Sequence, residues 1–238
     1  MNKKKLKIIQ TPARFYPNIG GVNKYVLDLS EQLVKIGHEV KVICSNEPSS
    51  KIKNIFGIEV KRLKYWFKIA NTNITPFLFF KLLKEDFDII HTHIPTPWSA
   101  DISMLVSIIK KKPLILTYHN DLIKNGIAKY IALIYNATLL KILFKKSKKI
   151  IITSSNYINH SNYLKNQIDK IVVIPNGVDL EEFKLDKNNK KVEYQIFFLS
   201  VLDIHHKYKG LDYLLYAMPD VIKQFPKTKL LIGGKGGI

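Results

Sequence analysis

The sequence predicts an α/β protein with a doubly wound parallel sheet, followed by the beginning of a second domain of similar design. Short runs of β-branched and apolar residues alternate with longer amphipathic segments, which is the pattern of consecutive β–α–β units. Several short runs are apolar without interruption, as is typical of strands that are covered on both faces of a sheet. The same alternation starts again after a polar stretch at residues 187–191.

The strands expected in the first domain are Leu6–Gln10, Val40–Cys44, Ile58–Leu63, Asp88–Thr92, Leu114–Tyr118, Ile150–Thr153 and Ile171–Ile174. The helices expected between them are Val22–Ile36, Pro76–Leu83, Trp98–Ile109, Ile127–Phe144 and Asn156–Leu164. The first helix illustrates the reasoning, because apolar residues recur every three or four positions and Gly37 follows as a helix-stop residue.

We place a domain boundary between residues 185 and 193, so that the first domain covers residues 1–185 and the second covers residues 193–238. The second domain is expected to hold the strand Ile196–Ser200, the helix Gly210–Gln224 and the strand Lys229–Ile232. Two parallel strands and one helix cannot bury their own apolar faces. We therefore expect the rest of this domain to be missing, either because it lies on another chain or because it has been lost.

The composition of the chain limits the classes of binding partner that we expect. The chain has 238 residues, 46% of them hydrophobic, and a formal net charge of +19, which indicates a globular protein with a large basic excess. Arg14 and Arg62 are the only arginines, whereas proteins that read nucleic acid sequence depend on arginine, so we expect no nucleic acid partner. The lysine excess leaves a coding bias or an anionic membrane surface or substrate as explanations.

Cys44 is the only cysteine, which excludes an internal disulfide and fits a reducing, cytoplasmic compartment. The apolar run after the basic N-terminus is too short for a secretory signal. The most apolar stretch, Tyr130–Phe144, is expected to be too short to span a bilayer. The segment Asn73–Lys84 combines apolar residues with lysines and could rest on the cytoplasmic face of an anionic membrane; an ordinary core-facing helix is the alternative.

Ligands of open parallel sheets bind at the carboxyl ends of the strands, so the loops after the strands carry the candidate residues. Gly20 and Gly21 follow the first strand and open a helix, where backbone N–H groups can approach an anion; a flexible connection is the alternative. Neither the G-x-G-x-x-G nor the G-x-x-x-x-G-K-[ST] pattern is present. This argues against an NAD-dependent oxidoreductase.

Histidines follow two further strands. His91 and His93 stand two positions apart in an extended segment and should share one face, as structural or substrate-contacting groups, because no further metal ligand is evident nearby. His119 ends the strand Leu114–Tyr118 and is either a substrate contact or a core histidine. Lys209 precedes the helix of the second domain, where a lysine is unfavourable unless it pairs with an anion; a solvated lysine is the alternative.

In order and spacing, these segments resemble family-4 retaining glycosyltransferases of the GT-B fold, in which two Rossmann-like domains face each other across a cleft. The matching segments are Tyr16–Val22 with Tyr25, Gly37–Val40, Ile90–His93, Thr117–His119, Val173–Asp179 and Lys209–Leu211 with Leu214, Leu215 and Ala217.

The resemblance implies a nucleotide-diphosphate-sugar donor held mainly by the second domain, an acceptor held mainly by the first, and no cofactor or obligatory metal. The acceptor class is a lipid, a saccharide or another hydroxyl compound. By position, Gly20 and Gly21 would lie against the donor phosphates, His119 would face the transferred sugar, and Lys209 would neutralise the leaving diphosphate.

Two departures from the family pattern bear on this reading. Many members have Gly-Arg-Leu where this chain has Ser200–Leu202, although one branch has the Leu-Asp-x-x-His-x-x-Lys-Gly pattern found at Leu202–Gly210. The Glu-x7-Glu segment that contacts the donor lies beyond the last residue of this sequence. We therefore expect this chain to be a partial glycosyltransferase with little or no activity of its own, with a non-catalytic or split-enzyme acceptor module as the alternative.

Overall fold

The computed structural model describes residues 4–18, 20–69, 72–123, 126–184 and 192–236, with the backbone alone at residues 204 and 205. The chain divides into two compact units, Met1–Gly177 and Val178–Ile238. The sequence placed this division between residues 185 and 193, most of which lie outside the described residues. By compactness the first unit ends at Gly177, so residues 178–184 are grouped with the second unit.

The first unit is built on an eight-stranded sheet with the strand order β10-β9-β8-β7-β1-β2-β4-β3. Every pair is parallel except β3 with β4, which confirms the predicted α/β class. The strands are β1 (Lys7–Thr11), β2 (Glu39–Ser45), β3 (Asn54–Ile55), β4 (Ile58–Leu63), β7 (Ile89–Ile94), β8 (Leu114–Tyr118), β9 (Lys149–Ile152) and β10 (Ile171–Val173).

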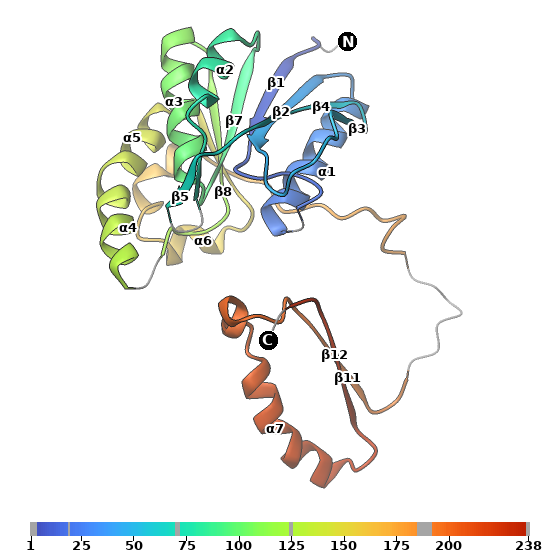
Figure 1. Ribbon diagram of the computed structural model, residues 1–238. Helices are drawn as coiled ribbons and strands as arrows, with labels where there is room; N and C mark the ends of the chain where they lie inside the picture. Colours follow the sequence, from blue (N-terminus) through green and yellow to red (C-terminus); the bar gives the residue numbers. More distant parts are fainter. Residues whose placement is uncertain (1–3, 19, 70–71, 124–125, 185–191, 237–238) are drawn as a thin grey trace. The chain divides into compact units, whose positions relative to one another are not determined.

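Helices cover both faces of this sheet (Figure 1). They are α1 (Gly21–Lys35), α2 (Leu78–Lys84), α3 (Pro97–Lys110), α4 (Ile127–Ala137), α5 (Leu139–Lys146) and α6 (Asn156–His160), with a 3₁₀ turn at Lys165–Lys170. The neighbours Val42 and Ile43 of β2 are both fully buried but belong to different core clusters, because successive side chains of a strand point to opposite faces. Burial on both faces explains the continuous apolar runs in the sequence.

The predicted helix Ile127–Phe144 is two helices, because the backbone of Thr138 leaves the helical region between α4 and α5. By length and composition, the run Ile127–Lys146 could nevertheless cross a membrane, with 33% of it buried inside the protein. This run is longer than the stretch Tyr130–Phe144 that the sequence analysis considered, and core helices of soluble proteins also meet this criterion.

A short antiparallel hairpin, β5 (Phe67–Ile69) with β6 (Thr72–Ile74), was not predicted. Its strands are too short to show an alternating pattern. Asn73–Lys84 is also not one amphipathic helix: it contains the end of β6 and the helix α2, whose Leu78 and Leu82 are buried in the core. One side of α2 therefore faces the core, while Phe77 and Phe80 of the same segment are exposed.

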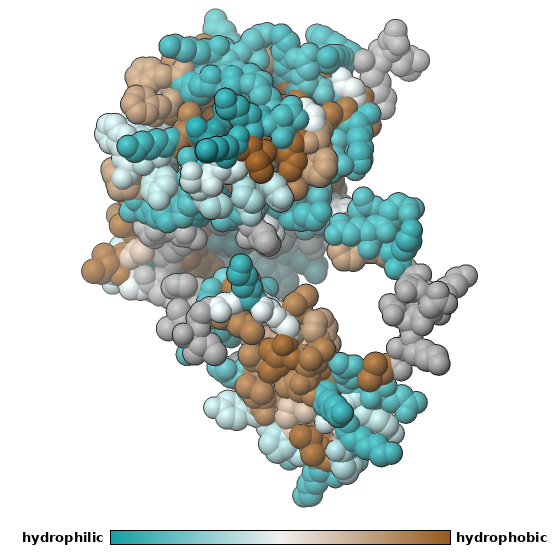
Figure 2. Space-filling view, turned by 45° about the vertical axis from the view of Figure 1, so that its right-hand side comes forward, coloured by the Kyte–Doolittle hydropathy of each residue, from teal (hydrophilic) through white to brown (hydrophobic). Residues whose placement is uncertain are grey.

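The second unit consists of β11 (Gln195–Leu199), a 3₁₀ turn (Ile204–Lys209), α7 (Leu211–Gln224) and β12 (Lys229–Gly233). The two strands are parallel. Among its described residues only Met218 is a buried hydrophobic residue, and Figure 2 shows apolar surface in brown on this unit. Exposed apolar side chains include Phe197, Leu199, Leu215, Leu231 and Ile232. As expected from one β–α–β unit, these elements do not bury their apolar faces.

An ion cluster at the amino-terminal side of the sheet gives the first prediction. Glu85 is 6% exposed and pairs with Lys41, Lys61 and Lys81. Burial alone would raise the pKa of Glu85, but hydrogen bonds from the three lysines bring it to about 2. Since the folded state favours the carboxylate, its contribution to stability is complete above the ordinary pKa of 4.5 and is lost as the pH falls toward about 2.

Glu85→Gln is therefore expected to lower the free energy of unfolding at neutral pH by about 2–4 kcal/mol, since it leaves three ammonium groups without their shared partner. Glu39→Gln, which removes an exposed pair with Lys5, should change it far less, because water screens exposed ion pairs. Urea unfolding at pH 7 and at pH 3 measures both effects. Equal losses in the two variants would contradict the assignment.

Candidate active site

The strand order reverses between β1 and β7, which pair with each other although their following helices lead to opposite sides of the sheet. Ligand crevices of open α/β sheets form at such a reversal, outside the carboxyl ends of the strands. The loop after β1 carries Gly20 and Gly21, β7 carries His91 and His93, and β8 is followed by His119. Gly20, Gly21 and His119, three of the four residues to which the resemblance assigns a role, therefore belong to this edge of the first unit.

The amino terminus of α1 is open to a ligand. Gly20 and Gly21 are both exposed, and no side chain caps the first turn of the helix. A Cβ atom added at Gly21 would meet no atom within 4 Å, so the space next to its backbone is empty. Unpaired N–H groups at a helix start attract anions such as phosphate. Gly20 has an extended backbone, so neither glycine is required by backbone strain.

The three predicted histidines form one cluster. The rings of His91 and His93 lie 4.6 Å apart, as their spacing predicted, and the His93 ring stacks on His119 at 5.6 Å. Nε2 of His93 lies 3.0 Å from Oε1 of Gln10, and Nδ1 of His93 lies 3.4 Å from Nε2 of His119. Nε2 of His91 bonds Oγ1 of Thr117 at 2.7 Å.

The orientation of the Gln10 amide is consistent with one pair of tautomers for His93 and His119. With the Gln10 oxygen as the acceptor, Nε2 of His93 carries the proton and its Nδ1 accepts from Nε2–H of His119. Nδ1 of His119 is then left to accept a hydrogen bond, for example from a sugar hydroxyl. His119 is partly exposed, whereas His91 and His93 are buried.

Burial keeps the cluster neutral. It lowers the pKa of His119 to about 4 and that of His91 to about 3, and it takes the pKa of His93 well below its usual range. At neutral pH each imidazole can therefore donate one hydrogen bond and accept one, and none adds positive charge to the site.

Tyr25 connects the glycine loop to this cluster. It lies on α1, one helical turn after Gly21, and its ring meets that of His119 edge-on at 4.9 Å. Its hydroxyl lies 3.5 Å from Oγ1 of Thr117. The start of α1 and His119 thus meet at one edge of the sheet. Tyr25 was predicted only through the family resemblance. Its position one helical turn after Gly21 is the sequence feature that could have indicated a place near the site.

Lys209 belongs to the second unit. It closes the 3₁₀ turn just before α7, next to Gly210, whose positive φ of 82° suits glycine. Asp203 accepts a 2.7 Å hydrogen bond from Nδ1 of His206 in the same turn, and Nζ of Lys209 lies 5.1 Å from the Tyr208 ring centre. Within the described part of the chain, no group of three or more His, Cys, Asp or Glu residues is arranged to hold a metal.

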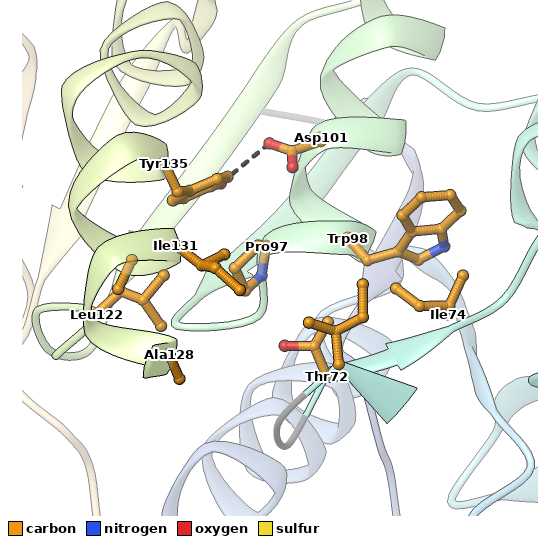
Figure 3. Close-up of a pocket in the computed structure, with 11 residues that line it drawn as sticks. Thr72, Ile74, Pro97, Trp98, Asp101, Leu122, Ala128, Ile131 and Tyr135 are labelled. Carbon is orange, nitrogen blue, oxygen red and sulfur yellow. Dashed lines mark hydrogen bonds between the residues drawn. The ribbon is translucent and has the colours of Figure 1, made fainter. Parts of the chain in front are cut away.

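A pocket of about 260 Å³ lies between the start of α3, α4 and the β5–β6 hairpin (Figure 3). Its walls include Ile74, Pro97, Trp98, Leu122 and Ile131. Its one carboxyl group, Asp101, accepts a 3.0 Å hydrogen bond from the Tyr135 hydroxyl. Burial raises the pKa of Asp101 to about 7. The sequence did not indicate this pocket, because its walls come from segments far apart in the chain.

The packing of Tyr25 on His119 gives the second prediction. Tyr25→Ala should expose the His119 imidazole to water, which removes the burial that depresses its pKa, so the pKa should rise from about 4 toward 6.5. Tyr25→Phe keeps the ring and should leave the value unchanged. NMR titration of the imidazole signals measures both variants. An unchanged His119 pKa in Tyr25→Ala would show that Tyr25 does not shield it.

Known glycosyltransferases are similar to this chain in sequence. The phosphatidyl-myo-inositol mannosyltransferase of Mycobacterium tuberculosis is 29% identical over 227 residues, 91% of this chain and 57% of the relative. The O-antigen chain mannosyltransferase C of Escherichia coli is 30% identical over 225 residues, 89% of this chain and 57% of the relative. The chain thus spans little more than half the length of these curated relatives.

Solved structures show the same fold. Anabaena HepE in complex with UDP superposes with a TM-score of 0.67 at 14% identity, over 99% of this chain and 62% of that one. A glycosyltransferase from Rickettsia africae gives 0.54 at 17% identity, over 98% and 69% of the two chains. The profile of glycosyltransferase family 4 matches residues 19–182. This match covers the glycine loop, the histidine cluster and more than half of the sequence, and the chain belongs to glycosyltransferase family 4.

Proposed function

We propose that this chain provides the acceptor-side domain and the first part of the donor-side domain of a glycosyltransferase that uses a nucleotide-diphosphate sugar. The observation that carries the proposal is the meeting of the open start of α1 with the neutral His119, through Tyr25, at the reversal of the strand order. Relatives named as mannosyltransferases and a structural neighbour solved with UDP-glucose support the same donor class.

In the proposed reaction the bond between the anomeric carbon and the diphosphate oxygen breaks, and the acceptor oxygen bonds to the same face of that carbon. The acceptor proton passes to an oxygen of the leaving diphosphate, so configuration is retained and no base from the protein is consumed. The N–H groups at Gly20 and Gly21 stabilise the charge that grows on the diphosphate. The family resemblance assigns the same role to the ammonium of Lys209. His119 holds the sugar through its Nδ1 atom and adds no competing charge.

We place this activity in the cytoplasm. Cys44 is a buried free thiol, and burial raises its pKa to about 12, so it stays protonated and inert at neutral pH. The uncovered apolar residues of the second unit favour an alternative role, in which the chain is one part of a split enzyme or a non-catalytic acceptor module. In either case we expect residues 1–238 alone to transfer sugar weakly or not at all.

Gly21 offers the sharpest test of the donor site. Since a side chain at Gly21 would occupy empty space, Gly21→Val should fold normally yet weaken binding of the donor diphosphate at least 10-fold, and Gly21→Ala should weaken it less. NMR titration of the purified chain with UDP-glucose and with GDP-mannose measures this. Wild-type amide signals of Gly20 and Gly21 and imidazole signals of His119 should shift, whereas those of His160, on α6, should not.

Equal binding by the wild type, Gly21→Ala and Gly21→Val would contradict the placement of the donor phosphates at α1. A radiolabelled-sugar assay of the same samples tests the partial character of the chain. Transfer by residues 1–238 alone, at rates typical of glycosyltransferases, would overturn the expectation that further polypeptide is needed.

A further inference from the structure

The helix α4 leaves an unusual apolar face uncovered. Ala132 and Tyr135 pack into the core, but Ile127 is 84% exposed, Tyr130 67% and Ile134 65%. A surface helix of a globular protein normally presents polar residues on the side away from the core. A contiguous apolar surface of this kind marks a place where another apolar partner binds.

The charge around α4 identifies the kind of partner. No Asp or Glu occurs between Leu122 and Ile168. Exposed lysines of α4, α5 and the turn after them are Lys129, Lys141, Lys145, Lys146, Lys148 and Lys149. Lysines near an anionic bilayer are attracted to its negative surface potential. A segment that exposes isoleucines and lysines and contains no acidic residue of its own is complementary to an anionic lipid surface, more than to a protein surface of mixed charge.

The pocket of Figure 3 opens next to this face. Ile131 belongs to both, because it lines the pocket and is 55% exposed. The walls are apolar apart from Thr72 and the pair formed by Asp101 and Tyr135. With the pKa of Asp101 raised to about 7, much of this carboxyl is uncharged at neutral pH, which suits a hydrocarbon ligand.

The pocket is also adjacent in the chain to the candidate active site. Leu122, which lines it, follows His119 by three residues. Pro97 and Trp98, on the other side, begin the helix that follows β7, the strand that carries His93. A molecule in the pocket therefore contacts the segments that directly continue the two histidine-bearing strands.

From these observations we propose that the pocket takes the acyl or polyprenyl chain of a lipid acceptor, and that the exposed face of α4 rests in the anionic bilayer that supplies this lipid. The proposal adds the acceptor class to the proposed function. It rests on that function only in calling the lipid an acceptor, because lipid binding itself does not depend on it. The membrane contact expected from the sequence thus moves from Asn73–Lys84, where Leu78 and Leu82 are buried, to α4.

Trp98 is a built-in probe for the chain in the pocket. The protein has two tryptophans, and Trp66 is 62% exposed, so Trp66→Phe leaves Trp98 as the single fluorophore. The experiment mixes this variant with phosphatidylcholine vesicles, with or without phosphatidylglycerol, whose acyl chains are brominated. We expect flotation only with phosphatidylglycerol, and quenching of Trp98 by the brominated chains.

Two variants separate the parts of the proposal. Ile127→Glu with Ile134→Glu should reduce flotation at least 10-fold, whereas Ile36→Glu, at a 59% exposed position after α1, should not change it. Ala128→Phe, which narrows the pocket, should still float but should lose most of the Trp98 quenching. Circular dichroism checks that all variants are folded.

Flotation without quenching of Trp98 would overturn the pocket assignment. Equal flotation of the Ile127→Glu/Ile134→Glu variant and the wild type, or no flotation by either, would overturn the membrane face. Dimerisation that the same variant abolishes, without flotation of the wild type, would assign the face to a second copy of the chain. No donor is present in these experiments, so their failure is distinct from a failure of nucleotide-sugar binding at Gly21.

Discussion

The constraint on which the site depends is the burial of one parallel sheet on both faces. Because helices must cover each face, the chain moves outward from β1 to β4, then returns to place β7 beside β1. This return brings the carboxyl ends of β1, β7 and β8 to neighbouring positions. Only for this reason does His93 contact both Gln10 and His119, two residues that are more than a hundred positions apart in the sequence.

The same burial sets the chemistry of the cluster. Three histidines in water would titrate near neutrality, and their mutual repulsion would disfavour the folded state. Inside the sheet edge, desolvation keeps them neutral, and Gln10 and Thr117 supply the hydrogen bonds that neutral rings require. In the proposed reaction, the positive potential at the leaving diphosphate therefore has to come from groups other than these histidines, such as the N–H groups at the start of α1.

Strand positions and the sharing of one face by His91 and His93 were predictable, because both follow from short-range periodicity. The break at Thr138 was not, since the apolar pattern continues through it from α4 into α5. Gln10 looked like the last residue of an apolar strand, and only the pairing of β1 with β7 brings its side chain to His93. Asp101 and Tyr135 lie 34 residues apart, so their hydrogen bond depends on helix packing that no local pattern encodes.

The two units expose apolar side chains for different physical reasons. In the second unit the strands and helix bury almost nothing among the described residues, so exposure of Phe197 or Leu231 follows from the small number of elements packed there. In the first unit the core is extensive, and α4 already packs Ala132 and Tyr135 against it. The exposure of Ile127 and Ile134 therefore does not result from a lack of elements to pack against. The proposed bilayer contact accounts for it, because a bilayer surface covers an apolar helix face while the lysine ammonium groups stay hydrated.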